Sequence, residues 1–167
     1  MSVKVNVQME EKYLYDFMVY HNYTHVSGIL GVGIGILGVA MGVKGIQSGG
    51  IAAGALWLFF AFYFLIVTPL SMKKKAKMQM KTARFLNPLE CEFTEEGLIV
   101  RQGEEEELSE WYTIVKAVST SKSVILYSGR MRAFIFPKEC MGEQYEEVLK
   151  MIHAHMPPAK VKIRGLL

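Results

Sequence analysis

Charged side chains are missing from two long stretches of the chain, Val26–Val43 and Ile51–Leu70. Both stretches are apolar. Their 18 and 20 residues, at about 1.5 Å per helical residue, match a hydrocarbon core about 30 Å thick. Two such runs in tandem exceed what a small soluble core buries. The missing charges also argue against proton relays and charged substrate sites, which mark transporters. We therefore predict a transmembrane hairpin over residues 26–70, composed of helices 26–43 and 51–70.

Cysteine is scarce too, since the chain has only Cys91 and Cys140. No disulfide framework follows from two residues, so we expect buried thiols in a reducing compartment. The sequence also lacks a Ser/His/Asp set, a phosphate-binding loop and a carboxylate pair in an apolar context. His21 and His25 share a helical face, but two ligands without a third do not make a metal site. We expect no enzyme, no cofactor and no metal.

Positive charge is concentrated immediately after the hairpin. Residues 1–25 carry mixed charges and lack the apolar segment of a cleavable signal peptide. The flank 71–88 carries six basic residues and no acidic one: Lys73, Lys74, Lys75, Lys77, Lys81 and Arg84. Because basic residues near a span stay in the cytoplasm, both termini should be cytoplasmic. The same residues are candidates for contact with anionic lipid head groups, and nothing indicates binding of nucleic acid.

Glycines gather on one side of the first apolar helix. At 100° per residue, five of them fall within an arc of about 80°; these are Gly28, Gly31, Gly35, Gly38 and Gly42. Small residues at four-residue spacing let helix backbones approach closely. We predict a packing face, occupied either by the second helix of the same chain or by another copy in a homo-oligomer.

Before the hairpin, the alternation of Val3, Val5 and Val7 with polar residues predicts a strand over residues 2–8. An isolated strand is unstable, so it should pair with a sheet that follows the hairpin. From Glu10 the apolar period becomes helical. Residues 1–25 should therefore form a strand and an amphipathic helix, and the hairpin is an insertion within one domain.

Short strand-like runs follow Pro88, and we assign residues 89–156 to a cytoplasmic α+β domain. The expected strands are 89–94, 98–102, 110–120, 123–128 and 132–136. Residues 103–107 are expected to be a solvated acidic loop. Pro137 should end the sheet, and apolar spacing from Met141 to Ile152 predicts a closing C-terminal helix. Residues 157–167 form a basic tail.

Two segments carry a family resemblance. Trp111–Val118 and the aromatic-rich segment Ser123–Lys138, which contains Ala-Phe-Ile-Phe-Pro-Lys, resemble the bacterial YcxB-like membrane proteins. The layout of strand, helix, two spans and small domain is similar along nearly the whole chain, although Glu139–Met141 departs from the pattern. The resemblance implies this architecture and a bacterial plasma membrane, and it carries no established biochemical activity.

The domain also resembles a divergent pleckstrin-homology (PH)-like barrel, by analogy of fold alone. A phosphoinositide site would be expected at the first hairpin turn, but Thr94–Gly97 contains two glutamates that would repel a phosphorylated head group. The fold expected is thus a transmembrane hairpin inserted into an antiparallel-sheet, PH-like domain. Our main hypothesis is a membrane-anchored, non-enzymatic module that binds a partner protein. The alternative is an oligomeric membrane assembly driven by the glycine face, with a transport role.

Overall fold

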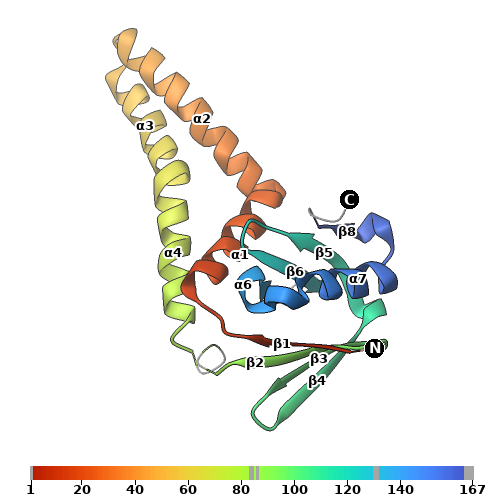
Figure 1. Ribbon diagram of the computed structural model, residues 1–167. Helices are drawn as coiled ribbons and strands as arrows, with labels where there is room; N and C mark the ends of the chain where they lie inside the picture. Colours follow the sequence, from red (N-terminus) through yellow and green to blue (C-terminus); the bar gives the residue numbers. More distant parts are fainter. Residues whose placement is uncertain (1, 83–84, 86, 130–131, 164–167) are drawn as a thin grey trace. The chain divides into compact units, whose positions relative to one another are not determined.

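The computed structural model describes residues 2–82, 85, 87–129 and 132–163 (Figure 1). The chain divides into two compact units. Met1–Phe17 together with Gln79–Leu167 form a strand-rich unit, and Met18–Met78 form a helical unit. The helical unit is thus an insertion between two pieces of the strand-rich unit, as the alternation of the first valines predicted.

The predicted apolar runs are helices, but their bounds differ from the prediction. Helix α1 (Glu11–Thr24) leads to α2 (Val26–Gln47), which continues four residues beyond the predicted end at Val43. The expected turn 44–50 is correspondingly short, and Gly49 provides its positive φ of 84°. Lys44 and Gln47 extend the helix because long unbranched side chains have good helix propensity.

The second helical stretch runs from α3 (Ile51–Phe62) through a π-helical turn, η1 (Tyr63–Val67), to α4 (Thr68–Gln79). Pro69 explains the turn, because it lacks an N–H and its ring crowds the carbonyl four residues earlier. Thr68 Oγ1 instead donates to the carbonyl of Tyr63 at 3.1 Å. By length and composition, Val26–Gln47 and Ile51–Gln79 are both able to cross a membrane.

Two four-stranded sheets make up the strand-rich unit. Sheet A has the order β1-β2-β3-β4, and sheet B has the order β7-β6-β5-β8. All neighbours are antiparallel except β5 and β8. The strands are β1 (Val3–Val7), β2 (Leu89–Phe93), β3 (Gly97–Gln102), β4 (Glu105–Glu110), β5 (Ile114–Ser119), β6 (Ser123–Ser128), β7 (Arg132–Pro137) and β8 (Val161–Lys162).

The N-terminal strand pairs across the insertion, and this confirms the prediction. Val3 lies opposite Phe93, and Val7 lies opposite Leu89. The three valines of β1 are buried, whereas the lysine and asparagine between them are exposed. Burial of one face fixes the register of a strand, since a slip of one residue would expose all three valines.

Two predictions about the later strands were wrong. Residues 105–107 of the predicted loop 103–107 are exposed as expected, but they form the first half of β4, because β3 supplies a partner for each of them. The strand predicted from Glu110 begins only at Ile114, after a 3-10 turn, η2 (Trp111–Thr113), at which the chain leaves sheet A for sheet B. The tail contains β8, which adds to β5 at Ala117 and Val118.

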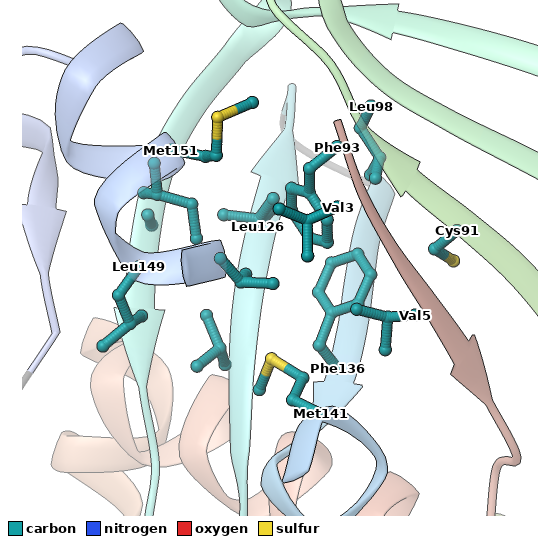
Figure 2. Packing of buried hydrophobic residues seen from close by; sticks show 14 of the residues in the cluster. Val3, Val5, Cys91, Phe93, Leu98, Leu126, Phe136, Met141, Leu149 and Met151 are labelled. Atoms are coloured by element: carbon teal, nitrogen blue, oxygen red, sulfur yellow. The ribbon is translucent and has the colours of Figure 1, made fainter. Parts of the chain in front are cut away.

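The C-terminal helix is broken in two. Helix α6 (Lys138–Met141) ends at Gly142, whose φ is 49°, and α7 (Tyr145–His155) follows a short turn, η3 (Gly142–Gln144). A second short turn, η4 (Pro158–Lys160), leads to β8. Figure 2 shows Leu149 and Met151 of α7 in the same buried cluster as Leu126 of sheet B and Phe93 of sheet A. The core lies between the two sheets and α7, as the apolar spacing of this helix predicted.

Candidate binding groove

The predicted glycine face of α2 lies against the second helix of the same unit. All five of its glycines are buried. A Cβ added to Gly38 would lie 2.8 Å from the carbonyl oxygen of Trp57, and one added to Gly35 would lie 2.7 Å from the side chain of Leu65. Gly33, on the opposite side, has nothing within 4 Å. The glycine face is therefore occupied within the chain.

The predicted basic flank, residues 71–88, is helical as far as Gln79, the last residue of α4. Lys73, Lys74, Lys75 and Lys77 lie on α4 and are exposed, and Lys81 follows the helix and is exposed too. Arg84 lies outside the described residues. Exposed ammonium groups close to an apolar helix are suited to anionic head groups.

A groove of about 1000 Å³ lies within the strand-rich unit, and we call it the β7 groove. One wall is β7, which lines it from Arg132 to Phe136. The other wall is sheet A, and Leu14 and Phe17 of α1 line the groove as well. This volume is at the upper end for small-molecule clefts.

Strand alternation explains which side chains of sheet A face the β7 groove. Residues directly opposite each other in an antiparallel pair point to the same face. Cys91 pairs with Val100, and Val100 pairs with Glu107. All three line the groove, as do Leu89 and the pair formed by Gln102 and Glu105. The floor is thus apolar along β2 and acidic along β4.

The charges of β4 are divided between its two faces. On the other face of sheet A, Arg101 donates to Glu92 at 2.8 Å and to Glu106, which also lines the groove, at 2.6 Å, so that the pKa of Arg101 rises and that of Glu92 falls. On the groove side, Arg132 pairs with Glu107 at 2.6 Å, although both side chains are more than half exposed. Glu105 forms no ion pair with any residue that the structure describes. The end of the β7 groove that β4 forms therefore carries net negative charge.

Cys91 is part of this floor but is not a reactive group. Its side chain is buried, and burial raises the pKa of its thiol to about 12. A thiol with so high a pKa is protonated at neutral pH and is a poor nucleophile. Cys140 is partly exposed and donates weakly to the carbonyl of Gln8 at 3.7 Å. Both cysteines are free, and of the two thiols expected to be buried only that of Cys91 is.

Helix α1, which lines the groove, is attached by a polar contact. Tyr13 Oη donates to Glu139 at 2.7 Å, and Lys12 Nζ donates to the same oxygen at 3.0 Å. These donors hold the pKa of Glu139 below its usual range. Phe17 lies near Tyr127 of sheet B, with ring centres 6.2 Å apart. The first half of α1 is thus fixed on the strand-rich unit.

The first hairpin turn of the domain, Thr94–Gly97, is held by aromatic and polar contacts. Trp111 Nε1 donates to the carbonyl of Thr94 at 2.9 Å, and the ring of His155 stacks on Trp111 with centres 5.2 Å apart. His155 Nε2 lies 3.0 Å from a carboxylate oxygen of Glu95. A phosphoinositide site would be expected at this turn, but here the turn contains the carboxylate of Glu95, which contacts His155.

The two histidines predicted on one helix face lie together, with the ring centres of His21 and His25 4.4 Å apart, but they do not share a helix, since α1 ends at Thr24 and His25 lies in the break before α2. Within the ranges that the structure describes, no group of three or more potential metal ligands occurs.

Sequence reasoning missed the β7 groove because its acidic end lies on a strand that was interpreted as a loop. The four glutamates within β4 have low strand propensity, and an edge strand exposed on both faces shows no apolar alternation. The one available signal was Arg101, which needed a carboxylate opposite it.

Comparison with known proteins supports the family resemblance. Residues 93–152 match the family model described as YcxB-like protein. The match begins at the end of β2 and extends through most of α7, so it contains β4, β7 and the wall of the groove. No curated protein was found that matches the chain.

Proposed function

Because residues 93–152 are YcxB-like, we propose that this chain anchors a protein-binding domain at the bacterial plasma membrane. Helices α2 and α3–α4 span the bilayer, and both termini lie in the cytoplasm. The strand-rich unit is a PH-like domain that binds a partner protein through the β7 groove and has no catalytic role of its own.

Surface chemistry supports membrane insertion of the helical unit. Only 28% of the most apolar window of the first helix is buried, and only 11% of that of the second. Large apolar side chains point outward, for example Ile36 at 62% and Phe62 at 57% exposure. A buried helix of a soluble protein would show the opposite pattern, and exposed apolar surface of this extent is unfavourable in water. Lipid is the environment that suits it.

Strand order supports the PH-like identity. Seven strands follow one another as a meander over two sheets, and a helix then packs on the core. The hairpin is inserted between the first and second strands. This order resembles that of PH-like barrels, and several domains related in architecture recognise peptides along a strand edge.

The observation that carries the proposal is the β7 groove itself. It combines an apolar floor, a strand edge and a negative end in one cavity. A protein segment offers apolar side chains, backbone hydrogen bonds and positive charge together. The alternative, an assembly driven by the glycine face, is less well supported because α3 already occupies that face.

Photo-cross-linking in living bacteria tests the proposal. A benzophenone amino acid replaces Phe134 in the groove wall or, as the matched control, Tyr112, which is 80% exposed elsewhere on the unit. We expect a discrete protein adduct from position 134 that is absent from position 112. Identical adduct patterns, or no protein adduct at position 134, would contradict the proposal.

Membrane topology is tested separately. The variant Ser48→Cys, with Cys91→Ser and Cys140→Ser, places one thiol in the turn between α2 and α3. A membrane-impermeant maleimide added to intact spheroplasts should label it. Labelling only after lysis would reverse the proposed orientation.

A further inference from the structure

The three long strands of sheet B, β5, β6 and β7, have two outer edges, and only one of these edges is covered by a further strand. On one side, the short parallel strand β8 adds to β5 and contributes Val161 and Lys162. On the other side, β7 pairs only with β6 among the described residues. The free edge of β7 is also the wall of the β7 groove.

The register shows which backbone groups of β7 point into the groove. Lys138 N donates to the carbonyl of Lys122 at 2.9 Å, which makes this a hydrogen-bonded pair. Hydrogen-bonded and non-bonded pairs alternate along an antiparallel ladder. The register between β6 and β7 has no shift from the pair Ser128 and Arg132 to the pair Ser123 and Pro137. The N–H and C=O groups of Ala133 and Ile135 therefore point away from β6. Pro137 also points this way and has no N–H to offer.

We propose that β7 accepts an extended segment of the partner protein as an added strand, with a Lys or Arg of that segment at the acidic end of the groove. This rests on the proposed function, because it specifies how the partner binds. Ala133 and Ile135 supply the backbone hydrogen bonds. Glu105 and Glu107 supply the charge selectivity.

The groove has surfaces for both faces of such a strand. Successive side chains of a strand point to opposite sides. An added strand beside β7 would direct one set toward the floor formed by Leu89 and Val100, and the other toward Leu14 and Phe17 of α1. An alternating apolar segment therefore fits better than a helix, which would leave the backbone groups of β7 without partners.

Charge selects a basic protein segment over anionic lipid. Glu105 and Glu107 lie on the groove side of β4, and Arg132 is the one cation among the described lining residues. Glu105 is not paired with it. A phosphate or carboxylate head group would meet net negative charge, whereas an ammonium or guanidinium group gains a charge-assisted hydrogen bond.

Three labelled peptides test the inference on the full chain in nanodiscs of neutral lipid. The first has eight alternating Val and Thr residues followed by two lysines. The second has glutamates in place of the lysines, and the third is the lysine peptide with N-methyl groups on alternate residues along one edge. By fluorescence anisotropy we expect the lysine peptide to bind, and each of the others to bind at least about fivefold more weakly, the effect of about one hydrogen bond.

Protein variants assign the contacts. Ala133→Pro removes the outward N–H without touching the ladder to β6, so it should weaken binding of the lysine peptide about fivefold. Ala133→Ser keeps this N–H and is the control. The pair Glu105→Gln and Glu107→Gln should abolish the preference for lysine over glutamate, whereas Glu110→Gln, at a residue of β4 that does not line the groove, should preserve it. Thermal unfolding checks that each variant is folded.

Several outcomes would overturn the inference. These are equal binding of the lysine and glutamate peptides, equal binding by Ala133→Pro and Ala133→Ser, and competition by vesicles of anionic lipid for the groove. Its failure is distinct from that of the proposed function. A partner cross-linked at position 134 whose binding is unaffected by Ala133→Pro would leave the groove as a protein-binding site and disprove strand addition.

Discussion

Gly38 gives the sharpest test of the packing in the helical unit. In Gly38→Ala the new Cβ would lie 2.8 Å from the carbonyl oxygen of Trp57 and 3.2 Å from the Cβ of Ala61. The first neighbour is backbone, which cannot rotate away, so α2 and α3 must separate by several tenths of an ångström. Gly33→Ala is the matched control, because its Cβ would meet nothing within 4 Å.

The magnitude follows from two opposing effects. Replacing Gly by Ala in a helix gains up to about 1 kcal/mol of helix propensity at either position. Overpacking of a close contact costs about 1–3 kcal/mol, and only Gly38→Ala incurs it. We therefore expect the free energy of unfolding of Gly38→Ala to be about 1–3 kcal/mol lower than that of Gly33→Ala.

The assay is reversible unfolding of the full chain in mixed micelles by increasing the fraction of sodium dodecyl sulfate. Fluorescence of Trp57, in the variant Trp111→Phe, reports the separation of α2 and α3, and cross-linking reports the oligomeric state. Equal unfolding midpoints for the two alanine variants would refute the packing. If Gly38→Ala instead dissociated an oligomer without changing the unfolding of the monomer, the glycine face would be a contact between chains.

Three further predictions concern the strand-rich unit. The pKa of Glu139 is lower in the folded chain than in the unfolded chain, where it is about 4.3. The ionised carboxylate therefore stabilises the fold above this pH, and the stabilisation is lost as the pH falls through the lower folded pKa. Glu139→Gln should make the free energy of unfolding less dependent on pH below about pH 4.5, and an unchanged pH dependence would disprove this. Alkylation by iodoacetamide at pH 8 should modify Cys140 well before Cys91, as mass spectrometry of peptides would show; the reverse order would contradict the burial of Cys91. Gly97→Ala should destabilise the domain by about 1–3 kcal/mol in chemical denaturation, because its Cβ would overlap the backbone carbonyl of Ser109; wild-type stability would show that β3 and β4 are farther apart.

Local patterns predicted most of the elements, because in those segments burial follows a simple period. Val3, Val5 and Val7 alternate with polar residues, so both the strand and its need for a partner could be inferred before the partner was known. The glycines of α2 likewise predicted a close packing face. In each case one face of the element carries a single kind of residue, valine on β1 and glycine on α2.

The groove could not be predicted in the same way. Glu105 and Glu107 are held in a strand by their pairing with β3. Their own strand propensity is low, so the local sequence does not predict this strand. The open edge of β7 depends on which strands reach each sheet, since its sequence resembles that of a central strand. The end of α2 was predicted wrongly for a related reason. Lys44 is compatible with either the end or the interior of a helix, and α2 continues to Gln47 because the turn is made at Gly49.

The pairing of Val7 with Leu89 has a consequence for biogenesis. During synthesis the first strand leaves the ribosome well before its partner. Under the proposed membrane insertion, sheet A can close only when both ends of the hairpin lie in the same compartment. A hairpin with a single crossing would then leave β1 and β2 on opposite sides of the bilayer, and the valines of β1 would have no sheet to join, so that folding of the domain would depend on complete insertion of the hairpin.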